Sequence, residues 1–178
     1  MKKVVLKTER LVLRPLRKGD EKILFENTNA KITRFLPFDY TDLKKCRKTV
    51  ERSMKSFGKS GFAFLAFSKN SEFVGQVNLH DFSERFRRAA IGIWVTEAVQ
   101  REGFGRELCV AILDFGFNCL KLNRIEYKIF TKNKVSEKLI QKIGGKFEGI
   151  SRKSICKYGK FFDEKIYSIL ASEWKRKK

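Results

Sequence analysis

The N-terminal third of the chain passes from a strand-like to a helix-like spacing of apolar residues. Residues 8–16 (TERLVLRPL) alternate leucines with polar neighbours, which predicts a half-buried edge strand. Gly19 and Asp20 then offer a cap for a first helix. Thr41 or Asp42 can cap a second helix that runs towards Phe57. We therefore expect one strand followed by two helices.

Three strand-like runs come next along the chain. They span residues 62–67, 73–79 and 89–95 and are rich in aromatic and branched side chains. The turn-forming segment 68–71 joins the first two runs, and the polar stretch 83–88 separates the last two. Connections this short join neighbouring antiparallel strands, so the pattern predicts an antiparallel meander.

The C-terminal half alternates helices with strands and ends in a hairpin. A loop with two glycines leads into a long amphipathic helix whose apolar positions extend to Leu120. The later pattern predicts a strand, a helix and two closing strands around a Tyr158-Gly159 turn, at residues 124–130, 135–143, 146–155 and 165–170. The predicted order is β, α, α, β, β, β, α, β, α, β, β. No linker or repeat interrupts it, so we expect a single domain over residues 1–178.

The composition is that of a globular protein without membrane segments. Hydrophobic residues make up 42% of the 178 residues, and 17 of them are Phe, enough for one substantial core. No run approaches the roughly 18 apolar residues needed to cross a bilayer, and no signal peptide is recognisable, so a cytoplasmic location is expected. The four cysteines form no C-x-x-C pair, which predicts idle thiols and no metal site: Cys46, Cys109, Cys119 and Cys156.

The chain is strongly basic. Forty Lys and Arg against 20 Asp and Glu give a formal charge of +20, which favours polyanionic partners. The lysines are spread along the whole sequence, as a compositional habit of the organism would also produce. The one compact basic run is residues 175–178, for which a solvated chain end is the simplest interpretation.

The segment Gln100-Arg101-Glu102-Gly103-Phe104-Gly105 carries the clearest chemical signal. Glycines between a strand and a helix allow close approach to the backbone, and the first amides of the helix are unbonded. These features favour an anion such as a phosphate, to which Arg101 and Arg106 can add charge. A tight turn without a ligand explains two glycines about as well. A dinucleotide fingerprint and a triphosphate-binding loop are both excluded by the spacing.

The surrounding motifs point to one family. Ile91-Gly92-Ile93-Trp94-Val95 followed by Gln100-x-x-Gly103-x-Gly105 resembles the pyrophosphate-binding segment of the GNAT superfamily of N-acetyltransferases. Further motifs look like its ribosomal-protein-alanine acetyltransferase branch: Thr8-Glu9-Arg10-Leu11, Phe115-Gly116-Phe117, Leu120-x-Leu122-Asn123-Arg124-Ile125-Glu126, Asn133-x-x-Ser136, Gly144-Gly145-Lys146-Phe147-Glu148-Gly149 and Gly159-x-x-x-Asp163 before Tyr167. The resemblance spans essentially the whole chain.

The resemblance implies a fold and a donor site. The fold is α/β (α+β), with a mixed, mostly antiparallel seven-stranded sheet flanked by helices and splayed between the fourth strand (89–95) and the fifth (124–130). Backbone groups of Trp94 and Val95 then bind the pantetheine arm of acetyl-CoA, and the loop from Gln100 to Arg106 holds its pyrophosphate. The amide of Val95 or Ile93 is expected to polarise the thioester carbonyl.

Asn133 and Ser136 are the remaining residues to which the resemblance gives a role. In the family, the Asn contacts the cofactor and the Ser can protonate the departing thiolate. Ser136 is accordingly the candidate general acid. Without the resemblance, Asn133 in a turn and Ser136 in the first turn of a helix that it helps to cap explain the pattern nearly as well.

A general base is not evident from the sequence. Many relatives place a carboxylate two residues before the Gly of the fourth strand, where this chain has Ala90. Glu126, Glu97, Asp81 and the only histidine, His80, are possible substitutes, although a solvated surface residue explains each of them. An α-amine, with a pKa near 8, depends less on such a base than a lysine side chain does.

Three functions remain open. The first is acetylation of a protein N-terminal α-amine, on a ribosomal protein and with ribosome association. The second is acetylation of a small amine, a polyamine or an aminoglycoside, which a +20 protein would repel unless its pocket is acidic. The third is a non-enzymatic RNA-binding or CoA-sensing module. The acceptor pocket is expected at residues 33–40 and 158–163, in either a monomer or a homodimer.

Overall fold

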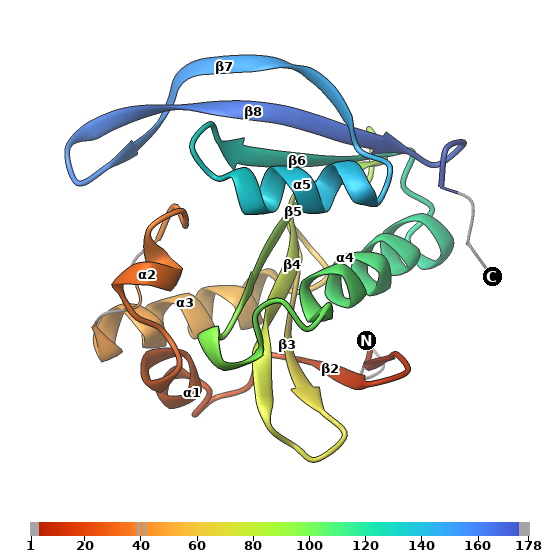
Figure 1. The fold of residues 1–178 in the computed structure, drawn as a ribbon. Helices are drawn as coiled ribbons and strands as arrows, with labels where there is room; N and C mark the ends of the chain where they lie inside the picture. Colours follow the sequence, from red (N-terminus) through yellow and green to blue (C-terminus); the bar gives the residue numbers. More distant parts are fainter. Residues whose placement is uncertain (1–3, 39, 41, 175–178) are drawn as a thin grey trace.

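The computed structural model describes residues 4–38, 40 and 42–174 (Figure 1). Its strands and helices are, in chain order, β1 (Leu6–Lys7), β2 (Leu11–Pro15), α1 (Glu21–Glu26), α2 (Ala30–Thr33), α3 (Leu43–Ser56), β3 (Phe62–Ser68), β4 (Phe73–Ser83), β5 (Arg88–Val95), α4 (Phe104–Asp114), β6 (Arg124–Phe130), α5 (Lys134–Lys142), β7 (Lys146–Lys157) and β8 (Lys160–Leu170). A 3₁₀ turn, η1 (Glu97–Val99), and a π-helical segment, η2 (Phe115–Cys119), flank α4. The predicted basic run at residues 175–178 lies outside the described residues.

The strands form one mixed sheet in the order β1-β2-β3-β4-β5-β6-β8-β7. Neighbours are antiparallel except β5 and β6, which run parallel, so the predicted meander and the mostly antiparallel class are confirmed. The sheet has eight strands instead of the expected seven. Thr8 causes the difference, because its amide donates to the Leu11 carbonyl at 2.9 Å and its hydroxyl accepts from the Leu11 amide at 2.9 Å. The chain turns there, and β1 pairs with β2.

The sheet opens between β5 and β6, as expected. Only the first three residues of β5 pair with β6: Arg88 with Arg124, Ala89 with Ile125 and Ala90 with Glu126. Beyond Ala90, β5 continues to Val95 while pairing only with β4. Figure 1 shows β6 and β8 turning away from β3, β4 and β5. One edge of β5 is therefore free of strand partners over five residues, from 91 to 95.

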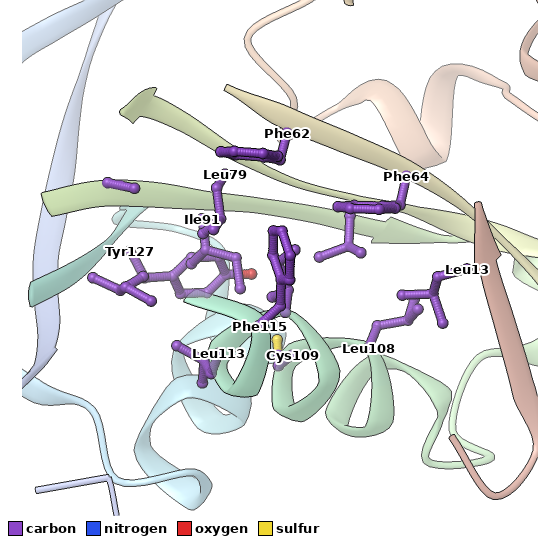
Figure 2. Packing of buried hydrophobic residues seen from close by; sticks show 14 of the residues in the cluster. Leu13, Phe62, Phe64, Leu79, Ile91, Leu108, Cys109, Leu113, Phe115 and Tyr127 are labelled. Atoms are coloured by element: carbon purple, nitrogen blue, oxygen red, sulfur yellow. The ribbon is translucent and has the colours of Figure 1, made fainter. Parts of the chain in front are cut away.

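Helices cover both faces of the sheet around two apolar clusters. On one face, α4 packs with buried residues of β2 to β6, including Leu13, Phe64 and Ile91 (Figure 2). Phe115 inserts edge-on between Phe62 and Phe64, with ring centroids 5.2 and 5.6 Å apart. On the other face, the second cluster joins Leu24 of α1 and the α3 residues Cys46 and Val50 to the sheet. Its members in the sheet include Leu65 of β3 and Trp94 of β5. The strands of the meander are buried on both faces, which holds β5 rigidly between the two clusters.

Two features of the N-terminal helices differ from the expectation. The short helix α2 was not predicted; Asn29 caps it by accepting from the Lys31 and Ile32 amides, both at 3.0 Å. Asp42 caps α3 as expected, whereas the alternative cap, Thr41, lies outside the described residues. Asp20 precedes α1 but does not cap it.

The predicted long helix is α-helical as far as Asp114. It continues to Cys119 as the π-helical segment η2. Gly116 explains the close packing there, since a Cβ on it would lie 2.6 Å from Ile125 Cδ1. The closing hairpin has longer strands than predicted, around the expected turn at Tyr158 (φ 51°) and Gly159 (φ 72°). Among the described residues, no helix is long and apolar enough to cross a membrane.

Candidate active site

The loop before α4 presents a row of unpaired amides. Gly103 adopts a left-handed conformation (φ 88°), and Arg101 also has a positive φ (70°). The amides of Arg106 and Glu107 both return to the Gly103 carbonyl at 3.1 Å. Within the described parts of the chain, the five preceding amides, 101–105, donate to no protein acceptor. Five amides at the positive end of a helix make a site for an anion.

Arg10 braces this loop, and the sequence analysis did not identify it as a site residue. Its Nε lies 2.7 Å from Glu107 Oε2, and its Nη1 donates to the Glu102 carbonyl at 3.1 Å. The guanidinium stands 4.1 Å from the centre of the Phe104 ring. Burial alone would raise the pKa of Glu107, but hydrogen bonds from Thr8 and Arg10 lower it overall. Glu107 therefore stays ionised and fixes the N-terminal edge of the sheet to α4.

The open edge of β5 presents the backbone of Ile93 and Val95. The Thr96 amide donates to the Val74 carbonyl of β4 at 2.9 Å. Since amides alternate between the two edges of a strand, those of Ile93 and Val95 point towards the gap beside β6. The carbonyl of Val95 accepts from Gln100 Nε2 at 3.4 Å on that side. The backbone of Trp94 was also expected to bind the pantetheine arm. Its carbonyl instead faces Gly75 of β4, so this expectation is corrected.

Asn133 and Ser136 meet at the start of α5. Asn133 is the N-cap, and its Oδ1 accepts from the Ser136 amide at 3.2 Å. Ser136 is close to the buried Tyr127 of β6, because burial raises the pKa of that phenol and the Ser136 side chain opposes the shift. Burial raises the pKa of Tyr127, so this phenol stays neutral. The side chain that caps α5 is thus that of Asn133 and not that of Ser136, which is left for other contacts.

The candidate bases divide into two groups. Ala90 pairs in register with His80 on β4 and with Glu126 on β6, so both flank the position that lacks a carboxylate. Asp81 lies beside His80, with 3.3 Å between Asp81 Oδ2 and His80 Nδ1. Glu97 is elsewhere, bound to Lys31 and Asn29 of the α2 region. Hydrogen bonds from Lys31 and Asn29 lower the pKa of Glu97, which suits an ion pair better than a base.

A cavity of about 410 Å³ lies between α2, the end of β6 and the turn between β7 and β8. It is lined by Ala30, Thr33, Arg34, Phe35, Phe130, Thr131, Lys132, Lys157, Tyr158, Phe162 and Asp163. Both segments expected to form the acceptor pocket contribute to it. Lys157 is buried and donates to the carbonyls of Thr33 and Leu36, the latter at 2.8 Å, which ties β7 to the segment after α2. The lining combines aromatic rings with a cationic rim.

The described residues include no group of three or more His, Cys, Asp or Glu side chains that could hold a metal ion. Cys46 and Cys109 are buried, and Cys119 and Cys156 are exposed. Burial raises the pKa of the Cys109 thiol to about 12, so it is not a thiolate near neutral pH.

Comparison with known proteins identifies the family. A sequence profile described as an acetyltransferase (GNAT) domain matches residues 10–146, well over half of the chain. The chain belongs to the GNAT acetyltransferase family. YoaA of Bacillus subtilis (strain 168), an uncharacterized N-acetyltransferase, is 27% identical over 173 residues, which cover 93% of this chain and 96% of YoaA.

One further relative of this GNAT protein and one solved structure of similar fold have names that state an acceptor. YdaF of Bacillus subtilis (strain 168), named as a proposed ribosomal N-acetyltransferase, is 29% identical over 104 residues, or 58% of this chain and 57% of YdaF. A spermidine N-acetyltransferase from Vibrio cholerae, solved with CoA and spermine, has a TM-score of 0.82 and 23% identity, covering 93% of this chain and 98% of that one. The second likeness shows a shared fold.

Family membership confirms the expected enzyme class, an acyltransferase, and the expected donor, acetyl-CoA. The residues present fit that donor. Five unpaired amides and Gly103 suit a pyrophosphate, and the open β5 edge beside it can pair with an amide-rich arm. Acetyl-CoA supplies an activated thioester. The chain itself supplies donors at Ile93 and Val95 that face the gap, which is where a carbonyl oxygen gaining charge needs them.

Proposed function

We propose that this GNAT enzyme acetylates the N-terminal α-amine of a protein, with ribosomal proteins as the expected class. The observation that carries the proposal is the charge of the cavity beside β6. Among the described residues, its lining holds Arg34, Lys132 and Lys157 but one carboxylate, Asp163. Polyamines and aminoglycosides carry several positive charges and are disfavoured by such a lining. A peptide N-terminus brings one amine together with apolar side chains.

The aromatic part of the cavity supports the same acceptor. Phe35, Phe130 and Phe162 offer apolar surface in which the first side chains of a peptide can be buried. The name of YdaF supports a ribosomal acceptor, whereas that of the Vibrio cholerae neighbour supports a polyamine. The net charge of +20 favours the RNA-rich ribosome and a location in the cytoplasm. The proposal rests on the cavity, which separates the two acceptor classes by charge.

In the proposed mechanism, the main-chain amides before α4 hold the pyrophosphate, and Asn133 lies at the N-terminus of α5 beside the same gap. The amide of Val95 or Ile93 stabilises the oxygen of the reacting carbonyl. Ser136, in the first turn of α5, protonates the departing thiolate. An α-amine needs little help to lose its proton near neutral pH, since its pKa is near 8.

The test is acetyl-CoA turnover, followed by thiol release, with peptides, polyamines and aminoglycosides as parallel acceptors. We expect kcat/KM for a peptide α-amine to exceed that for spermidine or an aminoglycoside. The same peptide with a blocked N-terminus and a free lysine is the matched acceptor control and should be inert. A preference for polyamines over every peptide would assign the small-amine alternative instead.

A further inference from the structure

A buried oxygen on β4, the strand next to β5, has no partner in the part of the chain that the structure describes. Asn78 lies in β4, in register with Gly92 of β5. Its Oδ1 is buried and accepts no hydrogen bond from any of residues 4–38, 40 and 42–174. A Cβ on Gly92 would lie 2.9 Å from this oxygen, so the amide group of Asn78 lies directly over the glycine. Buried acceptors are normally satisfied, and the exception requires an explanation.

A neighbouring residue of β4 shows how a carboxamide on this face of the sheet is satisfied. Side chains alternate along β4, so Gln76, Asn78 and His80 share one face of the sheet. The buried Gln76 has the same carboxamide group, and its Oε1 accepts from the Tyr40 hydroxyl at 3.0 Å and from Trp94 Nε1 at 3.2 Å. Asn78 has no such neighbours, because the residue opposite it is Gly92. Gly92 itself places no side chain against Asn78.

His80 completes this face of the sheet. It pairs with Ala90, whose methyl group leaves room where a longer side chain would stand. Asp81 Oδ2 lies 3.3 Å from His80 Nδ1, while Nε2 has no partner among the described residues. Lys128 on β6 lies 3.6 Å from the same Asp81 oxygen. Glu126, the other residue in register with Ala90, is engaged by Arg124 at 3.1 Å.

We propose that Asn78 and His80 form the subsite for the acceptor amine, an inference that rests on the proposed function. Asn78 Oδ1 accepts one N–H of the amine and orients its lone pair towards the thioester in the gap next to Gly92. His80 Nε2 takes up a proton from the ammonium. Asp81 beside Nδ1 keeps the imidazole in the tautomer whose Nε2 accepts a proton. Asn78 and His80 together replace the carboxylate that many relatives carry at the position of Ala90.

The step balances as follows. The ammonium loses one proton to His80 Nε2, and the neutral nitrogen forms a bond to the thioester carbonyl carbon while the carbon–sulfur bond breaks. The nitrogen gives its second proton to solvent as the carbon–sulfur bond breaks. Ser136 gives its proton to the thiolate and regains one from solvent. One proton per turnover therefore leaves to solvent from His80. The products are an N-acetyl amide and a free thiol.

Asn78→Leu separates this role from a structural one. The substitution removes an unsatisfied buried oxygen at nearly constant shape, so the thermal midpoint should stay unchanged or rise. If the oxygen binds the amine, kcat/KM for the best peptide acceptor should fall about 10- to 100-fold, while the affinity for acetyl-CoA is unchanged. Asn78→Asp keeps an acceptor and should retain activity within about 10-fold of the wild type. Asn70→Leu, in the exposed turn before β4, is the matched control and should keep full activity.

His80→Gln tests the proton transfer through its pH dependence. At pH 7 we expect a loss of about 100-fold or more in kcat/KM, because general-base assistance is removed. The loss should shrink above pH 8, where the α-amine is already neutral. Asp81→Asn should reproduce part of the loss at neutral pH. A purely structural effect of His80 would be the same at every pH, and that result would overturn the proposal.

The inference and the proposed function fail in different ways. If wild-type enzyme binds acetyl-CoA but acetylates no peptide, the proposed acceptor class is wrong. If it acetylates peptides and Asn78→Leu keeps full kcat/KM, or loses it together with its thermal midpoint, the amine subsite is wrong. If Asn78→Leu is more stable and less active, the oxygen is unpaired because the substrate is its partner.

Discussion

Gly103 is the residue on which donor binding depends most directly. Its φ of 88° is readily adopted only by glycine, and it stands at the row of unpaired amides before α4. Gly103→Glu should lower the affinity for CoA at least 100-fold, because it adds strain and a negative charge where the pyrophosphate binds. Calorimetry of CoA binding measures this loss.

The matched control for Gly103→Glu is Gly144→Glu. Gly144 also has a left-handed φ, of 98°, and nothing lies within 4 Å of the position of a Cβ on it. It follows α5, away from the amide row. Both variants should lose about 1 kcal/mol of stability from backbone strain, but only Gly103→Glu should lose CoA binding. Equal CoA affinity in the two variants would show that the loop does not hold the pyrophosphate.

Ser136 and Asn133 allow chemistry to be separated from helix capping. The cap bond of α5 runs from the Ser136 amide to the Asn133 side chain, so the Ser136 hydroxyl takes no part in it. Ser136→Ala should therefore lower kcat by about 10-fold or more, with little change in thermal midpoint. Asn133→Ala should cost about 1 kcal/mol of stability through the lost cap. Steady-state kinetics and thermal melts on both variants test this, and an unchanged kcat in Ser136→Ala would remove it as the acid.

At the residue scale, the sequence predicted what local motifs carry and missed what the sheet brings together. The Gly103 loop, Asn133 and Ser136 stand in short contiguous motifs, so their proximity needs no tertiary information. Asn78 stands in no such motif, and the motif Thr8-Glu9-Arg10-Leu11 gave Arg10 no role in the site. Arg10 acts on a loop about 90 positions away, and Asn78 is notable only because β5 places a glycine opposite it. Periodicity states which face a residue occupies but not which partner it meets there.

At the scale of elements, long periodic segments were predicted and short ones were not. The meander and α3 have enough turns or alternations for a pattern to appear. The four-residue helix α2 has barely one turn, and its signal is the cap Asn29 alone. Likewise, no pattern distinguishes an α-helix from the π-helical segment that follows Asp114. The gap between β5 and β6 followed only from the family resemblance, since parallel pairing between distant strands leaves no local signal.

The contacts of Arg10 with α4 and with the loop before it predict an effect of Arg10 on donor binding. Arg10 contacts Glu107, the Glu102 carbonyl and the Phe104 ring, so it orders the start of α4. Arg10→Ala should raise KM for acetyl-CoA about 5- to 50-fold by loosening the amide row. Since the Arg10 side chain is 43% exposed, the loss of stability should stay near ~1 kcal/mol or below.

Arg47→Ala is the control for Arg10→Ala. Arg47 is more exposed, at 61%, and lies 3.7 Å from Glu21, so this variant also removes one surface ion pair. It should leave KM for acetyl-CoA unchanged. If both variants raise KM equally, a general loss of positive charge explains the effect, and the brace does not.

The contact between α5 and β8 should respond to acid. Hydrogen bonds from Lys165 and Tyr167 hold the pKa of Glu137 at about 2, below its usual value near 4.5. Because the folded pKa is depressed, the stabilisation is fully present above about pH 4.5 and is lost as the pH falls towards 2. Glu137→Gln should therefore lower the urea midpoint at pH 7, with a difference that shrinks between pH 4.5 and 2. Glu84→Gln, at the exposed β4–β5 turn, should show no such difference.

At the scale of the whole molecule, the charge of +20 predicts how the enzyme finds its acceptor. If it works at the ribosome, long-range attraction to RNA phosphates adds to what the cavity recognises, and salt weakens that attraction. The cavity itself is the same for a free peptide and for the same N-terminus presented on a ribosome. We therefore compare the fold-loss in kcat/KM between about 50 and 300 mM salt for the two acceptors. It should be at least about 10 times larger for the ribosome-bound N-terminus than for the free peptide. Equal salt dependence would show that the charge serves solubility or donor binding and does not direct the enzyme to the ribosome.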